Sequence, residues 1–190
     1  MSKLTEITWY GRGGQGVVTA GKVLAEAAME AGRYFQSSPE YGQERAGAPI
    51  RAYTRLSDQP ISLHSNIEEP DIVVVLDPTV IGPVDVTAGL KSDGLIIVNT
   101  GKPPQEMRQQ LKLEGGCVVT IDATRIAIDE IGRDITNTPL LGAFAAATGI
   151  FSVQEIVEQT RSRFGKKLAP HVVEANVRAI ERAAREIQEG

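Results

Sequence analysis

Apolar runs alternate with amphipathic stretches along this chain, and that alternation is typical of a layered α/β fold. A first strand is expected at residues 7–10, and a helix at 17–31 follows it after a glycine-rich turn. Three later runs are continuously apolar, as expected of central parallel strands that are covered on both faces. These runs are residues 71–77, 94–99 and 117–122, with a short crossover helix expected at 103–113.

The pattern changes twice more along the chain. Residues 50–56 alternate apolar and polar side chains, and a turn signal at 57–60 separates them from the short run 61–64, which predicts an antiparallel hairpin. The last third predicts helices at 138–147, at 152–164 and from Pro170 onward, with Thr138 as the N-cap of the first. We therefore expect a three-layer α/β sandwich with a mostly parallel sheet, an antiparallel hairpin and a helical C-terminal third.

Length and charge narrow the class of protein. The 190 residues, of which 42% are hydrophobic, suit one soluble domain over residues 1–190. With 20 Lys and Arg against 24 Asp and Glu, the net charge is −4, and no basic run is long enough to follow a phosphate backbone, so nucleic acid is not expected as a partner. The apolar runs are too short to cross a bilayer, and the N-terminal residues have no apolar signal core, so a cytoplasmic location without membrane contact is expected.

The cysteine and histidine content excludes several kinds of site. Cys117 is the only cysteine, so this chain cannot form an internal disulfide or hold a cysteine-ligated iron–sulfur cluster by itself. His64 and His171 lie far apart in the sequence and have no evident partner ligands. We expect no metal site, a buried and unreactive Cys117, and structural or exposed histidines.

A glycine-rich loop between the first strand and the first helix is the first candidate site. Residues 11–16 read GRGGQG and match the pattern G-x-G-x-x-G, in which glycines permit a tight turn and a helix start offers free N–H groups. Three interpretations stay open: a dinucleotide site, glycines needed only for packing, or contact with another ligand or a partner subunit. A dinucleotide site needs an acidic residue about 20 positions on, and none occurs before Glu40. The candidate binding residues of this loop are Arg12, Gly13, Gly14, Gln15 and Gly16.

A second candidate is the polar, glycine-punctuated segment 37–51. It is longer than a minimal connection, and such loops on a rigid scaffold often carry function, although a solvated connection would look similar. Its candidate residues are Glu40, Tyr41, Arg45 and Arg51. Asp77 and Asn99 end predicted strands and are expected to cap the segments that follow, and Asn137 is expected to anchor its loop to backbone.

Four sequence blocks together resemble the gamma subunit of pyruvate and other 2-oxoacid:ferredoxin oxidoreductases. The blocks are GRGGQG at 11–16, PEYGQERAGAP at 39–49, DIVVVLD at 71–77 and NTPLLGA at 137–143. They cover essentially the whole chain, and their order and spacing make the resemblance specific.

The resemblance implies one subunit of a larger enzyme that oxidatively decarboxylates a 2-oxoacid, with pyruvate as the expected substrate. That enzyme uses thiamine diphosphate, Mg and [4Fe–4S] clusters, passes electrons to ferredoxin and forms an acyl-CoA from coenzyme A. The expected partners are alpha, beta and delta-type subunits. This chain has no Gly-Asp-Gly of the thiamine motif and too few cysteines for a cluster, so it is expected to bind no cofactor alone and to supply no catalytic residue.

The resemblance also suggests roles for the candidate residues. Arg12, Arg45 and Arg51 are expected to donate to the phosphates of coenzyme A or to carboxylates of a neighbouring subunit. Glu40 and Tyr41 are expected to shape the entrance to the decarboxylation site. Two alternatives remain: a stand-alone dinucleotide-binding protein, and a scaffold subunit that never meets substrate.

Overall fold

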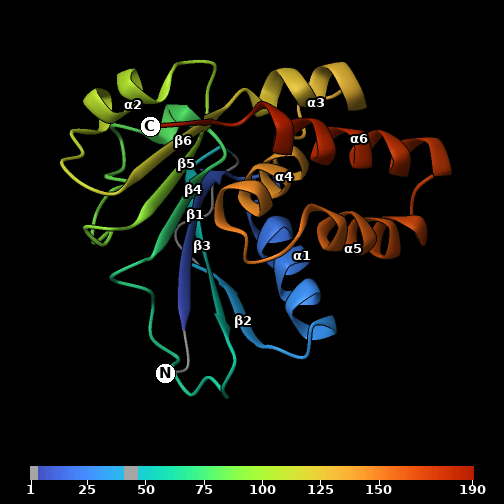
Figure 1. Ribbon diagram of the computed structural model, residues 1–190, viewed down its shortest axis with the longest axis horizontal. Helices are drawn as coiled ribbons and strands as arrows, with labels where there is room; N and C mark the ends of the chain where they lie inside the picture. The colour runs from blue at the N-terminus through green and yellow to red at the C-terminus, as the bar shows by residue number, and fades with distance from the viewer. Residues whose placement is uncertain (1–3, 41–46) are drawn as a thin grey trace.

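A seven-stranded mixed sheet forms the centre of the molecule in the computed structural model, which describes residues 4–40 and 47–190 (Figure 1). The strand order is β2-β3-β1-β4-β5-β6-β7. The strands are β1 (Thr5–Arg12), β2 (Tyr34–Pro39), β3 (Pro49–Ser57), β4 (Ile72–Val75), β5 (Leu95–Asn99), β6 (Cys117–Ile121) and β7 (Gln188–Glu189). The expected α/β class is confirmed.

The four central strands run parallel, as their sequences predict. β1 pairs with β4, β4 with β5 and β5 with β6, all in parallel register. Every residue of β4 is buried, because helices or loops cover the middle of the sheet on both faces. Continuous apolar runs fit this environment, since neither face of such a strand meets water.

The antiparallel hairpin exists, but its expected second strand was wrong. β3 pairs with β1 on one side and with β2 on the other, so residues 61–64 have no free edge of β3 to join and form no strand. Arg55 of β3 holds the residues after 61–64 in place instead, because its guanidinium donates to the carbonyl of Ser65 at 2.9 Å. The same guanidinium donates to Oε1 of Gln36 in β2 at 3.0 Å. It also pairs with Glu6 at 2.8 Å. The hairpin therefore consists of β2 and β3.

Six α-helices and one short 3-10 helix complete the described chain. They are α1 (Val17–Glu30), η1 (Pro78–Val80), α2 (Pro104–Leu111), α3 (Ala123–Ile131), α4 (Asn137–Thr148), α5 (Val153–Gly165) and α6 (Pro170–Glu186). The predicted helices are present, whereas α3, η1, β2 and β7 were not predicted, and the segment 37–51, expected as one long connection, includes the end of β2 and the start of β3. Thr138 is not the N-cap of α4: that residue is Thr136, and Thr138 lies inside the first turn, where its hydroxyl donates to Asn176. Among the described residues, no helix is long and apolar enough to span a bilayer.

The two faces of the sheet are covered unequally. Helix α1 and the helices of the C-terminal third pack on one face, and α2 with the segment around η1 covers the other (Figure 1). The larger core lies on the first face, where Trp9 of β1 and Phe144 of α4 meet with ring centroids 5.9 Å apart. This arrangement is the expected three-layer sandwich with a helical C-terminal third.

One glycine determines how closely two of these helices approach. A Cβ atom placed on Gly142 of α4 would lie 2.1 Å from the carbonyl oxygen of Ile180 in α6. The obstacle is backbone, which cannot rotate away as a side chain can. The α4–α6 contact thus requires glycine at position 142.

We expect Gly142→Ala to lower the free energy of unfolding by about 1–3 kcal/mol, since the helices must separate to admit a methyl group. Gly165→Ala is the matched control, because Gly165 ends α5 and its added Cβ would meet nothing within 4 Å. This control should be neutral or stabilising by up to ~1 kcal/mol. Urea unfolding of both variants tests the contact, and equal stability of the two would contradict it.

Candidate functional site

The carboxyl ends of the parallel strands meet at one edge of the sheet, the carboxyl edge, and the polar candidates gather there. The glycine loop follows β1, Asp77 follows β4 and Asn99 ends β5. Because β3 runs antiparallel to β1, its first residues reach the same edge: Pro49 lies opposite Arg12. Open α/β sheets place ligands at this edge.

The glycine loop leads directly into α1. Gly16 is the N-cap of α1, with φ of 81°, a left-handed conformation that glycine adopts without strain. A Cβ atom on Gly16 would also lie 2.7 Å from Nδ2 of Asn137, so the loop passes directly against the start of α4. The α1 N-terminus therefore offers N–H groups and a positive dipole end beside Asn137.

Arg12 and Gln15 of the loop are held by the segment after β4. Nε of Arg12 donates to Oγ1 of Thr79 at 2.8 Å, another guanidinium nitrogen donates to the carbonyl of Gly47 at 2.7 Å, and the guanidinium lies 3.6 Å from Asp77. Nε2 of Gln15 donates to Oδ2 of Asp77 at 2.7 Å. We call these four side chains, Arg12, Gln15, Asp77 and Thr79, the loop brace.

The charge of Asp77 is stabilised by the loop brace. Partial burial alone would raise the pKa of Asp77, but hydrogen bonds from Thr79 and Gln15 and the charge of Arg12 outweigh it, so the pKa is lowered. Asp77 also caps η1 by accepting from the Thr79 N–H at 2.8 Å, which confirms its expected capping role. The expectation that Asn99 caps the segment after it was wrong: its amide nitrogen donates to the carbonyl of Leu76, just after β4, and to Thr124 of α3.

Glu40 and Arg51 form a second polar cluster at this edge, on the face opposite α1. Arg51 donates to Glu40 at 2.8 Å and lies over the ring of Tyr10, 6.0 Å from its centroid. The hydroxyl of Tyr53 donates to the other oxygen of Glu40 at 2.8 Å. Burial, together with this bond to Glu40, raises the pKa of Tyr53 to about 12, so Tyr53 remains a donor at physiological pH.

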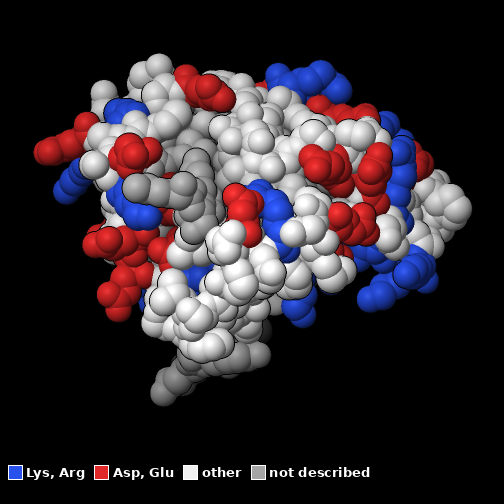
Figure 2. Space-filling model, turned by 60° about the horizontal axis from the view of Figure 1, so that its bottom comes forward, with Lys and Arg blue, Asp and Glu red and all other residues white. Residues whose placement is uncertain are grey.

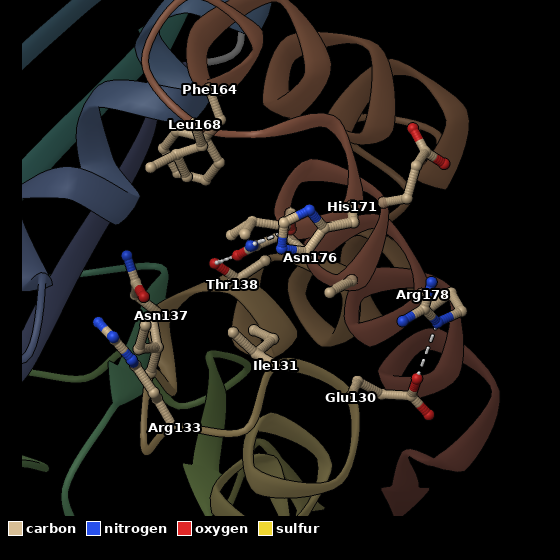
Figure 3. A pocket seen from close by; sticks show the side chains of 14 residues that line it. Glu130, Ile131, Arg133, Asn137, Thr138, Phe164, Leu168, His171, Asn176 and Arg178 are labelled. Atoms are coloured by element: carbon tan, nitrogen blue, oxygen red, sulfur yellow. Dashed lines mark hydrogen bonds and ion pairs between the residues drawn. The ribbon is translucent and has the colours of Figure 1, made fainter.

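A cavity of about 710 Å³ opens beside the glycine loop, on the face of the sheet that α1 and the C-terminal helices cover (Figure 3). It lies between the end of α3, the start of α4 and the corner joining α5 to α6. Arg133 and Asn137 stand on one side, with Phe164 and Leu168 across from them (Figure 3). Most of the exposed lining is apolar, which is usual for a site that takes a small organic molecule.

One buried polar atom of Asn137, a residue that lines this cavity, has no partner. Asn137 is 6% exposed, and its Oδ1 accepts no hydrogen bond. The expected anchoring of the preceding loop through this oxygen was therefore wrong. Its neighbours Thr138 and Asn176 bond to each other at 3.0 Å and are satisfied. A buried acceptor without a donor costs free energy.

The other residues predicted from the sequence lie either in the glycine loop or outside the described residues. Gly13 and Gly14 lie in the loop, and the Gly13 N–H donates to the carbonyl of Ala48 at 3.2 Å. Tyr41 and Arg45 fall outside the described residues. The cavity itself was missed by sequence reasoning, because its walls come from segments 130–138 and 164–178, and helical periodicity does not show how distant helices meet.

The topology differs from that of a dinucleotide-binding fold. In the latter, the second strand lies beside the first and its terminal acid holds the ribose. Here β3 separates β2 from β1, and Glu40 at the end of β2 is engaged by Arg51 and Tyr53. Within residues 4–40 and 47–190, no three His, Cys, Asp or Glu side chains are grouped to hold a metal ion.

Known proteins resemble the chain over nearly its whole length. A family model for pyruvate ferredoxin/flavodoxin oxidoreductase matches residues 6–186. The pyruvate synthase subunit PorC of Thermotoga maritima is 46% identical over 98% of this chain and 96% of its own. A protein of Thermococcus kodakarensis named pyruvate/ketoisovalerate oxidoreductases common subunit gamma is 47% identical over 95% of each chain.

Solved structures agree with the sequence matches. The crystal structure of the Thermotoga maritima subunit PORC superposes with a TM-score of 0.88 at 41% identity, covering 99% of both chains. The 2-oxoglutarate:ferredoxin oxidoreductase of Magnetococcus marinus matches with a TM-score of 0.78 at 20% identity over 31% of that chain, which shows a shared fold. The chain therefore belongs to the pyruvate ferredoxin/flavodoxin oxidoreductase family, as a gamma-type subunit of a multi-subunit oxidoreductase.

Proposed function

We propose that this subunit closes the cleft in which its partner subunits hold thiamine diphosphate and coenzyme A, and that the carboxyl edge faces that cleft. Family membership supports the subunit role, and the position of the cavity beside the α1 N-terminus and the glycine loop supports the choice of edge. In the proposed complex, alpha, beta and delta-type subunits carry the thiamine diphosphate, Mg and [4Fe–4S] clusters that supply the decarboxylation and the electron transfer to ferredoxin. This chain would bind and orient coenzyme A, and it would exclude water from the cleft.

The cavity fits the chemistry of coenzyme A. Its pantetheine arm combines apolar carbons with amide groups, which suit the apolar walls and the side-chain amide of Asn137 among them. Its phosphates suit the positive end of α1 and the exposed guanidinium of Arg133. Among the described residues, Arg133 has no ion-pair partner, so its charge is free for such a ligand.

The arginines of the two candidate loops receive different roles. The guanidinium of Arg12 donates hydrogen bonds to Thr79 and to the carbonyl of Gly47, so we propose that Arg12 holds the glycine loop in shape. The side chain of Arg51 is 41% exposed and is paired with Glu40, which suits a contact with a carboxylate or phosphate at the rim of the cleft. A rim held in this way would need little reorganisation when the complex assembles.

Substrate selectivity is proposed to lie in other subunits. The relatives from Thermococcus kodakarensis and Pyrococcus furiosus are each named as a gamma subunit common to pyruvate and ketoisovalerate oxidoreductases. A subunit shared by two enzymes with different substrates cannot by itself determine which oxoacid is used. Pyruvate is the substrate proposed for the complex that contains this chain.

The first test omits this chain from the complex. We expect the remaining subunits to lose CoA-dependent pyruvate oxidation coupled to ferredoxin reduction, and the isolated chain to show none, because the cleft would lack one wall. Adding the purified chain back should restore the rate. Full turnover without it would contradict the proposal.

A second test concerns the contact with coenzyme A. In the assembled complex, Asn137→Leu should raise the KM for CoA about tenfold with kcat little changed, the effect of one lost hydrogen bond. Arg133→Ala should act in the same direction. Arg185→Ala is its matched control, an exposed arginine in the last turn of α6 that should leave the KM unchanged. Normal CoA kinetics with intact assembly in both site variants would favour the scaffold alternative.

A third test concerns the loop brace and pH. Because the pKa of Asp77 is lowered in the folded state, its stabilising effect is complete above the unfolded value of about 3.9 and is lost as the pH falls through the folded value. Asp77→Asn should cost about 1–3 kcal/mol at neutral pH, and this difference should shrink below about pH 4.

Asp85→Asn is the matched control for the loop brace. Asp85 accepts from the N–H and the hydroxyl of Thr87, the same local turn that Asp77 forms with Thr79, but it has no counterpart of Gln15 or Arg12. Chemical denaturation from neutral to acidic pH compares the two. If Asp85→Asn costs as much as Asp77→Asn, the contacts to Gln15 and Arg12 contribute nothing.

A further inference from the structure

The outer edge of β2 offers backbone hydrogen-bonding groups that no described strand uses. β2 is the last strand of the sheet and pairs only with β3. The Glu40 N–H donates to the carbonyl of Arg51, and in an antiparallel ladder every second residue then bonds inward. Tyr34, Gln36 and Ser38 therefore bond toward β3, while Phe35 and Ser37 direct their N–H and C=O groups outward.

This edge has little of the protection that exposed strands usually carry. Natural edge strands are often blocked by lysines, charges or bulges, yet residues 34–39 include no charged side chain. The charged residues on either side of β2 form ion pairs, Arg33 with Asp58 and Glu40 with Arg51. Pro39 is the exception, because it occupies an outward position and has no N–H to give. The open row is therefore limited to Phe35 and Ser37.

We propose that two copies of this subunit pair through β2 in antiparallel register about a two-fold axis. Phe35 of each copy lies opposite Ser37 of the other, and Gln36 lies opposite Gln36. This register uses the N–H and C=O of both outward residues in each copy, and the two prolines lie beyond its ends. Each copy offers the same two outward residues, so the N–H and C=O groups of one copy satisfy those of the other. The interface is therefore isologous, and the two sheets become continuous.

The surroundings of β2 favour a second copy of this chain. Tyr34 and Phe35 are 48% and 41% exposed, and Met29 at the end of α1 is 58% exposed. Figure 2 shows few charged side chains over the lower part of the molecule, where β2 begins and the N-terminus lies (compare Figure 1). Two chains of net charge −4 can approach here without bringing like charges together.

Disulfide trapping tests the register directly. In a Cys117→Ser background, Gln36→Cys should form an intermolecular disulfide under mild oxidation, since directly opposed residues of a non-hydrogen-bonded pair have Cα atoms about 4.5 Å apart. Ser38→Cys is the matched control on the same face of β2. It would lie opposite Tyr34, about 13 Å along the strand from its own counterpart, and should remain reduced.

Sedimentation of the full chain tests the dimer without new cysteines. The wild-type subunit should dimerise with rising concentration, and Phe35→Lys should weaken the dimer about tenfold or more by placing a charge on each edge. Leu63→Lys, the same change at a residue that is 45% exposed outside β2, should dimerise normally. Ser37→Pro should also prevent pairing, because it removes an outward N–H and leaves the β2–β3 ladder intact.

Three results would overturn the inference: a wild-type chain that stays monomeric at all soluble concentrations, a dimer that Gln36→Cys does not cross-link, or a Gln36→Cys cross-link to a different subunit in the purified complex. The last would assign the edge to a strand of that subunit. None of these results bears on CoA kinetics, so the two proposals fail independently.

Discussion

The parallel alignment of β1 with β4, and of β4 with β5 and β6, determines where the polar residues of this chain meet. Parallel strands bring all their carboxyl ends to one edge, and each chain segment that leaves that edge begins with a turn or a helix start. Asp77 and Asn99 lie there: Asp77 holds the segment that follows it, and Asn99 joins Leu76, after β4, to Thr124 of α3. The glycine loop is shaped by contacts from the segment after β4 as much as by its own glycines, so the edge forms only when the strands align.

Much of this arrangement could be predicted because its signals are local. A continuous apolar run identifies a covered strand wherever its neighbours lie, and a Ser-x-x-Glu sequence such as Ser152 to Glu155 caps a helix within four residues. The failures are non-local. Residues 61–64 have strand-like composition, but β2 had already taken the open edge of β3. Which strand wins an edge depends on competition between distant segments, and periodicity does not measure that competition.

The candidate site could likewise be predicted only in part: the sequence indicated the residues, but not their partners. Arg12, Gln15 and Glu40 were identified as chemically capable residues, but partners such as Thr79 and Tyr53 were not, because Thr79 lies in η1 and Tyr53 in β3. A residue type in a loop indicates which interactions are available, and the fold decides whether a neighbour uses them. Asn137 shows the converse: its sequence position suggests a structural anchor, and its oxygen is left without a donor.

Two features of the described chain are left without hydrogen-bond partners by its own residues. Buried polar atoms without partners are rare in folded proteins, and the other buried side-chain atoms of this kind in the described chain are the hydroxyls of Thr8, Thr120 and Thr160. Asn137 differs from these threonines because the residue lines the cavity beside the α1 N-terminus. The outward backbone row of β2 is a second incomplete feature, and it lies on the sheet edge farthest from β6 and β7. The two incomplete features therefore differ in kind, one a side chain beside a cavity and the other a row of backbone groups along a strand.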